Sequence, residues 1–121
     1  MKSENAYLMD ILESAQFIQK YVSGIEQDEF EKAILIQDAV VRRLEIIGEA
    51  TKHLSENFRL GRPDLPWKQM AGMRDVLIHD YDTVDLDLLW DTAIQSIPAL
   101  IAQLEPLVTP KRSNKNSPET E

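Results

Sequence analysis

The sequence of 121 residues contains no cysteine, four scattered glycines and no apolar run long enough to cross a membrane. Without cysteine the chain cannot form a disulfide, a thiolate nucleophile or a zinc site with sulfur ligands. The glycines do not form the glycine-rich loop that cradles phosphate. Apolar runs such as residues 33–36 are far shorter than the ~20 residues of a membrane span. These absences favour a soluble protein, which we expect to be cytoplasmic.

Basic residues are in the minority, with 13 lysines and arginines against 21 aspartates and glutamates and a formal net charge of −8. Such a chain does not attract nucleic acid or anionic lipid through its overall charge, so we expect neither DNA nor a membrane as a partner. The acidity is uneven, however. Residues 31–80 carry eight bases and eight acids, whereas residues 81–109 carry five acids and no base. An anionic ligand is therefore expected in the middle of the chain, at a local cleft that contacts few phosphates.

The apolar residues recur with helical spacing, and no segment shows the alternation typical of a β-strand. From Leu8 to Val22 the spacing predicts a first helix, which Gly24 closes because glycine readily adopts the left-handed conformation at a helix end. Asp28, with a glutamate three residues later, predicts the start of the longest helix, over about 28–56. The apolar side of this helix is wide enough to contact more than one neighbour.

The long helix contains Gly48, which lowers helix propensity and therefore predicts close approach by another backbone. A polar loop is expected over residues 57–65. Pro66 is placed in the first turn of a third helix, and Asp85 is placed to cap a fourth, in which Pro98 predicts a kink.

Together these helices predict one all-α domain, an antiparallel four-helix bundle over residues 1–108. A chain of this length suffices for one domain and is too short for two ordinary ones. The remaining residues, 109–121, are polar and lack apolar side chains that a core could use, which predicts a disordered tail.

The residues best suited to chemistry lie together near the end of the predicted third helix. Arg74 offers a permanent planar cation that can make two hydrogen bonds with a phosphate. His79 offers an imidazole, a group that near neutral pH can take a proton from a ribose 2′-hydroxyl or return one to a leaving oxygen. Together they would form a minimal ribonuclease that needs no metal. The other histidine, His53, stands beside a polar stripe and is interpreted as a surface residue.

The spacing of Arg74 and His79 leaves their arrangement open. Five residues at 100° each would place the two side chains about 140° apart on an ideal helix. Either the helix unwinds before His79, or two copies of the motif meet across a dimer axis and supply both an acid and a base. An arginine and a histidine at a helix end also have an ordinary structural explanation, because cations there complement the helix dipole.

The segment Arg74-x-x-x-x-His79-x-Tyr81 resembles the R-x-x-x-x-H-x-Y motif of the HepT-like toxins, a branch of the HEPN superfamily. The resemblance covers about residues 5–107 and leaves only the tail unmatched. Within that range it is carried by three further stretches, at residues 37–50, 66–74 and 84–90.

This resemblance implies a HEPN-type bundle that forms a homodimer, with an RNA-cleaving site in a cleft at the dimer interface. Arg74 would hold the scissile phosphate and His79 would act as acid and base. Asp75, the polar residue after the motif arginine, would orient Arg74 or its neighbours. Attack by the 2′-hydroxyl would leave a 2′,3′-cyclic phosphate and a free 5′-hydroxyl, without a metal or another cofactor.

The resemblance also implies a partner and a role for Tyr81. Family members are toxins of type II toxin–antitoxin systems, paired with a minimal nucleotidyltransferase antitoxin that transfers AMP to the motif tyrosine. AMP on Tyr81 would place negative charge beside Arg74 and His79 and so compete with RNA. Two alternatives stay open. Tyr81 can instead be a half-buried structural aromatic, and the chain can be a catalytically inactive helical module that binds and supports a nucleotidyltransferase.

Overall fold

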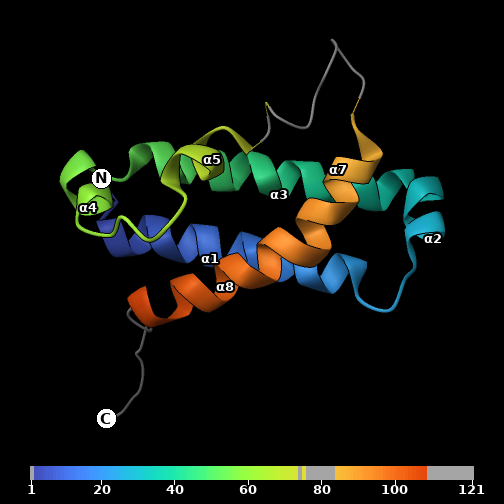
Figure 1. Ribbon diagram of the computed structural model, residues 1–121, viewed down its shortest axis with the longest axis horizontal. Helices are drawn as coiled ribbons and strands as arrows, with labels where there is room; N and C mark the ends of the chain where they lie inside the picture. Colours follow the sequence, from blue (N-terminus) through green and yellow to red (C-terminus); the bar gives the residue numbers. More distant parts are fainter. Residues whose placement is uncertain (1, 74, 76–83, 109–121) are drawn as a thin grey trace.

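The computed structural model describes residues 2–73, 75 and 84–108 (Figure 1). Within these ranges every regular element is a helix. They are α1 (Glu4–Val22), α2 (Gln27–Lys32), α3 (Ile34–His53), α4 (Glu56–Leu60), α5 (Trp67–Ala71), α7 (Leu86–Asp91) and α8 (Ile97–Leu104), with a π-helical turn at Thr92–Ser96 and a 3₁₀ turn at Glu105–Leu107. The predicted tail, 109–121, lies outside the described residues.

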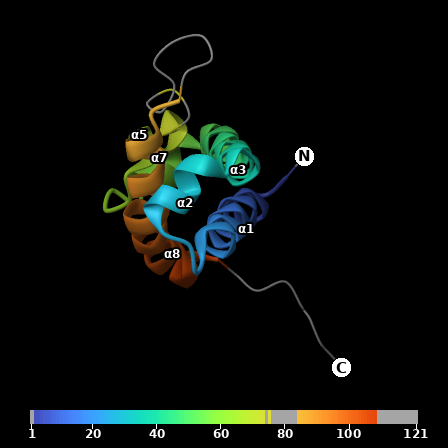
Figure 2. The ribbon, with the colours of Figure 1, turned by 90° about the vertical axis from the view of Figure 1, so that its right-hand side faces the viewer.

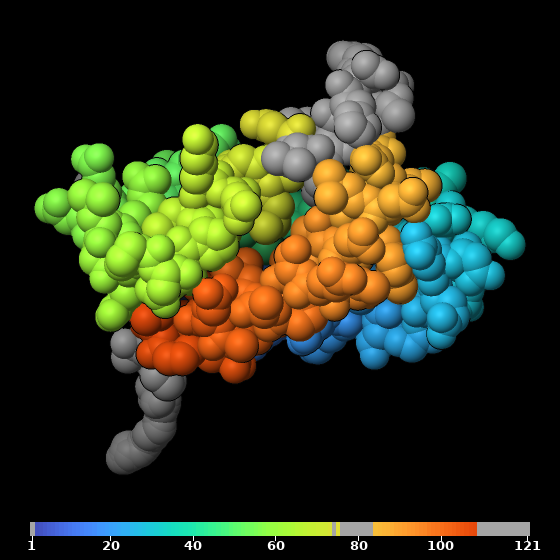
Figure 3. Space-filling model, in the orientation of Figure 1, coloured from blue at the N-terminus to red at the C-terminus, as the bar shows by residue number. Residues whose placement is uncertain are grey.

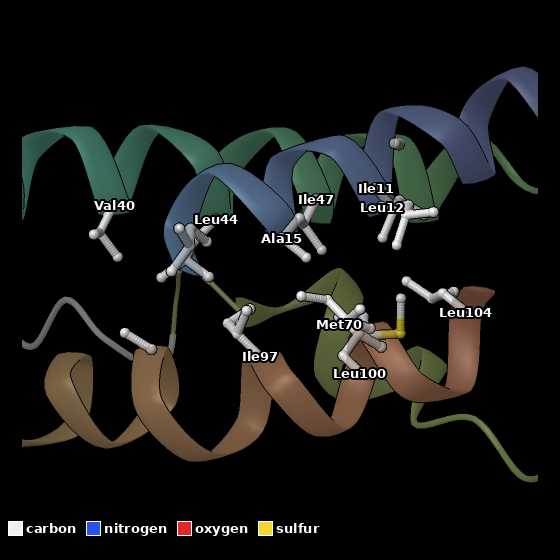
Figure 4. Packing of buried hydrophobic residues seen from close by; sticks show 14 of the residues in the cluster. Ile11, Leu12, Ala15, Val40, Leu44, Ile47, Met70, Ile97, Leu100 and Leu104 are labelled. Carbon is white, nitrogen blue, oxygen red and sulfur yellow. The ribbon is translucent and has the colours of Figure 1, made fainter. Parts of the chain in front are cut away.

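The helices form two layers, with α1 and α3 antiparallel in one layer and α5, α7 and α8 in the other (Figures 1 and 2). Apolar side chains of both layers fill the space between them. In Figure 4, Leu44 and Ile47 of α3 point toward Met70 of α5 and Ile97 of α8, and all four are completely buried. The predicted all-α bundle is therefore confirmed. Since α3 contacts α1, α2 and α5, the expectation that its wide apolar side serves several neighbours is also confirmed.

The first helix begins and ends much as predicted. Ser3 caps its start, because the Ser3 hydroxyl oxygen accepts a hydrogen bond from the backbone N–H of Ala6 at 3.1 Å. Beyond its end, Gly24 has a φ of +81°, a conformation that side chains with a β-carbon rarely adopt. Gly24 thus closes the helix as expected.

The prediction of one continuous helix over residues 28–56 is wrong, because the chain turns at Ala33 and divides that stretch into α2 and α3. The backbone of Ala33 has φ −97° and ψ 77°, outside the helical region. Two contacts hold the turn. Phe30 is completely buried with its ring centroid 5.2 Å from that of Trp90, and the Gln37 side-chain amide donates to the Phe30 carbonyl at 2.8 Å. The turn thus depends on a tertiary contact, and the sequence around Ala33 contains no proline or glycine that would predict it.

The start of α2 also lies before the predicted position at Asp28. The N-cap residue is Glu26, whose backbone N–H donates to the carboxylate of Glu29 at 2.9 Å. Asp28 lies inside the first turn of α2, where its negative charge complements the helix dipole. The prediction of an acidic residue at the start of this helix is therefore right, but its predicted position is two residues too late.

The predicted loop over 57–65 contains a short helix, α4, which is held by Ser55. The Ser55 hydroxyl oxygen accepts from the backbone N–H of Phe58 at 3.1 Å. Ser55 also donates to Glu4 at the start of α1, through its hydroxyl and through its backbone N–H at 3.1 Å. One serine therefore both caps α4 and ties it to α1.

We expect Ser55→Ala to lower the free energy of unfolding by about 1 kcal/mol, the usual effect of removing an N-cap. Urea denaturation measures this loss. Ser23→Ala, which changes an exposed serine after α1, is the matched control and should alter stability by less than about 0.5 kcal/mol. Equal effects of the two substitutions would show that the Ser55 contacts do not stabilise the fold.

The last helical segment begins as predicted and is distorted near Pro98. The Asp85 carboxylate accepts from the backbone N–H of Leu88 at 3.0 Å, which confirms Asp85 as the cap. Pro98 has no N–H to offer the carbonyl four residues earlier, and the helix widens into the π-helical turn at Thr92–Ser96 just before it. This π-helical turn is the irregularity that the structure shows near Pro98, and the kink itself stays a prediction.

Candidate functional site

Of the four predicted site residues, only Asp75 belongs to the described part of the chain, where it is exposed. Arg74, His79 and Tyr81 lie outside the described residues. The possibility that a helix unwinds before His79 concerns the same undescribed residues. The structure does describe the elements between which this segment runs. These are α5 before it and α7 after it.

The core holds the chain on both sides of the segment. In α5, Met70 is completely buried, and the indole N–H of Trp67 donates to the Arg62 carbonyl at 2.8 Å. Met73 and Val84, the nearest described residues before Arg74 and after Thr83, are half-buried and pack against the core. The core therefore holds in place the described residues on both sides of the segment that carries the motif.

On one side, α5 approaches α3 closely at Gly48. A β-carbon on Gly48 would lie 3.1 Å from the carbonyl oxygen of Ala71 and 3.5 Å from that of Met70. The first distance is tighter than ordinary van der Waals contact, so the present spacing depends on a residue without a side chain. The predicted backbone approach at Gly48 is confirmed, and the neighbour is the helix that leads to Arg74.

An open groove of about 260 Å³ lies beside this crossing and reaches Asp75. The side of the groove formed by α3 carries two cations in surface ion pairs, Arg42 with Glu45 at 3.8 Å and Lys52 with Glu49 at 3.8 Å. Surface pairs of this kind contribute little to stability, so an anion in the groove could draw either cation away from its glutamate at little cost. The lining residues are Arg42, Glu45, Gly48, Glu49, Lys52, Ala71 and Asp75.

A second groove, of about 430 Å³, runs on the other side of α5, between this helix and the α7–α8 segment (Figure 3). Its lining is largely apolar and includes Met73, Leu88 and Leu100, with polar groups from Thr92 and Ser96 of the π-helical turn. The chain therefore enters the motif segment between two grooves, one charged and one mainly apolar.

Arg42 and Lys52 lie on the polar side of α3, and the spacing of residues along the sequence does not connect them with Asp75. The signal that connects them is Gly48, because the polar stripe borders the point where α5 approaches α3. The partner helix at that point could not be read from the spacing of residues on one helix.

His53 is exposed, as predicted, and its ring stacks on that of Tyr7 with centroids 5.2 Å apart and an interplanar angle of 9°. Within the described ranges, no group of three or more histidine and carboxylate side chains is arranged to hold a metal ion. The described helices also include none with the length and apolar character that crossing a membrane requires.

Comparison with known families gives a match over most of the chain. Residues 11–107 match the family model described as "Ribonuclease HepT-like". No solved structure matches the chain significantly.

Individual relatives agree with the family match. A protein of Caldanaerobacter subterraneus named "putative RNase" is 42% identical over 108 residues, which cover 89% of this chain and 96% of the relative. A Thermococcus cleftensis protein named "probable ribonuclease HepT" is 42% identical over 106 residues, covering 88% and 96%. A Methanocaldococcus jannaschii protein named "gamma-glutamylcyclotransferase and putative RNase" is 41% identical over 116 residues, and the chain spans only 52% of its length.

Proposed function

Because this chain belongs to the HepT-like ribonuclease family of the HEPN superfamily, we propose that it is an endoribonuclease and the toxin of a type II toxin–antitoxin system. The observation that carries this proposal is the family match over residues 11–107, which includes the whole Arg74–Tyr81 motif. The test is cleavage of RNA by the purified full chain, free of any nucleotidyltransferase and with a chelator present. Persistent failure to cleave RNA would contradict the proposal.

In the proposed reaction, Arg74 binds the scissile phosphate and neutralises charge that develops on it. His79 removes the proton from the 2′-hydroxyl, and the 2′-oxygen forms a bond to phosphorus. The bond from phosphorus to the 5′-oxygen breaks, and that oxygen receives a proton from a second acid. The products are a 2′,3′-cyclic phosphate and a 5′-hydroxyl, and no metal takes part. Asp75, exposed at the edge of the charged groove, is a positioning residue for Arg74.

A homodimer would supply the second acid. The motif contains one histidine, whereas the reaction needs a base for the 2′-hydroxyl and an acid for the leaving oxygen at the same site. Two copies of the segment that meet at a dimer axis would provide both groups, one His79 neutral and the other protonated. The proposed cleft for RNA therefore lies between two protomers.

We propose further that a minimal nucleotidyltransferase antitoxin transfers AMP to Tyr81. The phenol oxygen attacks the α-phosphorus of ATP, pyrophosphate leaves, and the phenol proton passes to a base of the transferase. The added phosphate carries negative charge into the position where Arg74 would otherwise meet RNA, which explains neutralisation of the toxin.

Intact mass after incubation with this partner and ATP should rise for the wild-type chain by whole AMP groups, and it should not rise for Tyr81→Phe. Tyr7→Phe is the matched control, because Tyr7 is a tyrosine of α1 remote in sequence from the motif, and this variant should gain mass as the wild type does. Modification of Tyr81→Phe to the wild-type extent would exclude Tyr81 as the acceptor.

A further inference from the structure

Two aromatic rings and two cations gather on the surface where α1 and α3 run side by side. The guanidinium carbon of Arg43 lies 4.4 Å from the centroid of the Phe17 ring, and the Arg43 Nε donates to the Tyr21 hydroxyl at 3.4 Å. The Lys20 Nζ lies 5.7 Å from the same Phe17 centroid. The rings of Phe17 and Tyr21 are 6.1 Å apart and close to parallel, at 23°. We refer to these four residues as the aromatic–cationic patch.

The bundle core does not account for Phe17. The residues of α1 that face the core, such as Ile11, Ala15 and Ile18, are completely buried, whereas Phe17 is 38% exposed. Arg43 contacts both Phe17 and Tyr21. These two contacts hold the Arg43 guanidinium beside the Phe17 ring. Phe17 and Arg43 are therefore held next to each other at the surface, beside Tyr21, which packs against the core.

The cations of the patch keep their charge available. Within residues 2–73, 75 and 84–108, no carboxylate oxygen lies within 4.0 Å of the charged nitrogens of Lys20 or Arg43. This contrasts with Arg42 and Lys52, which both pair with a glutamate. In a chain with a net charge of −8, the patch is thus complementary to a ligand that combines anionic groups with flat aromatic groups.

Single-stranded RNA has this combination, because phosphates pair with cations and unstacked bases stack on aromatic rings and on guanidinium planes. Along α3, the patch also follows directly on the groove that reaches Asp75. Arg42 lines the groove that reaches Asp75, and the next residue, Arg43, belongs to the patch. A strand that passes from the groove to the patch needs to cross only one helix, about 10–12 Å in diameter.

We propose that the aromatic–cationic patch binds a segment of single-stranded RNA that flanks the cleaved bond. A base stacks on the exposed side of Phe17, and Arg43 and Lys20 contact the neighbouring phosphates. This proposal rests on the proposed ribonuclease function. It extends the substrate contacts beyond the motif, so that substrate is recognised as an unpaired strand of several nucleotides.

The test measures RNA binding separately from cleavage. The full chain carrying His79→Ala is titrated against a fluorescent, unstructured RNA of mixed sequence, and the anisotropy gives Kd. In this background Phe17→Leu, which keeps apolar bulk and removes the ring, should raise Kd by about fivefold to a hundredfold, the usual effect of losing one stacked base. Phe17→Tyr should restore binding. Arg43→Gln should weaken binding and reduce the slope of log K against log salt by about 0.7 for each lost phosphate contact.

The double variant Leu60→Ala with Arg62→Ala is the matched control. It removes an exposed apolar side chain and an exposed cation near α4, and it should leave Kd unchanged. An unchanged Kd in Phe17→Leu would overturn the proposal. So would dissociation of an oligomer by Phe17→Leu in sedimentation velocity without RNA, because the patch would then be a contact between copies of this chain.

The two proposals fail in different ways. If the wild-type chain cleaves no RNA, the ribonuclease function fails, whatever the patch binds. If the wild-type chain cleaves RNA and the patch variants bind it normally, only the assignment of the patch fails.

Discussion

Substituting alanine for His79 is expected to reduce the rate of RNA cleavage by about 10²–10⁴-fold, the usual contribution of one general acid or base. In the proposed dimer the substitution removes both the base and the acid, so the loss should lie at the upper end of this range. Arg74→Ala should reduce cleavage comparably, because the phosphate then loses its bidentate cation. Rates are measured on full-length protein free of antitoxin with a chelator present, and the cleaved ends are mapped for a 2′,3′-cyclic phosphate.

The chain offers a matched control for each substitution. His53→Ala removes the other histidine, which is exposed and stacked on Tyr7, and Arg62→Ala removes an exposed arginine near α4. Both controls should cleave RNA at the wild-type rate. Full activity in Arg74→Ala and His79→Ala would exclude these residues from the mechanism. Intact RNA with every form, together with AMP transfer to Tyr81, would instead favour the inactive helical module that supports a nucleotidyltransferase.

Phe30→Ala is expected to lower the free energy of unfolding by about 3–5 kcal/mol, the usual cost of deleting a large buried aromatic side chain. Phe30 is completely buried and packs on Trp90 at 5.2 Å, so the substitution removes the contact that holds the turn at Ala33 against the last helical segment. Because domains of this kind are stable by only about 5–15 kcal/mol in total, the loss is a large fraction. Urea denaturation followed by circular dichroism measures it.

Phe30→Leu should cost less than Phe30→Ala, because most of the buried volume remains, and it provides a folded variant if the alanine form is too unstable to study. Leu60→Ala, at a position that is 70% exposed, should change stability by less than about 0.5 kcal/mol. A loss below about 1 kcal/mol in Phe30→Ala would contradict the view that burial of this ring stabilises the bundle.

The helical class and much of the core could be predicted from apolar spacing, because apolar residues that recur with helical spacing are buried. Examples are Leu8 and Ile11 of α1, and Leu44 and Ile47 of α3. The turn at Ala33 could not be predicted from this spacing. The residues around it favour a helix, and the turn depends on contact between Phe30 and a tryptophan sixty residues later. A local pattern carries no information about such a partner, so tertiary packing overrides local propensity here.

The candidate site divides in a similar way. Arg74, His79 and Tyr81 were identified from their chemistry, their spacing and a family resemblance, and their roles stay predictions. Gly48 gave a partial signal, because a glycine inside a helix indicates close approach by a neighbour. The neighbour itself, the carbonyl of Ala71, follows only from how α5 packs on α3.

The crossing at Gly48 also bears on how activity can change among related chains. The distance between α3 and the helix that leads to Arg74 is set at a position that carries no functional group. A larger residue there would push α5 away from α3 while every side chain of the motif is retained. We therefore expect RNA cleavage by related chains to vary with the residue at the position of Gly48, even where the motif is unchanged.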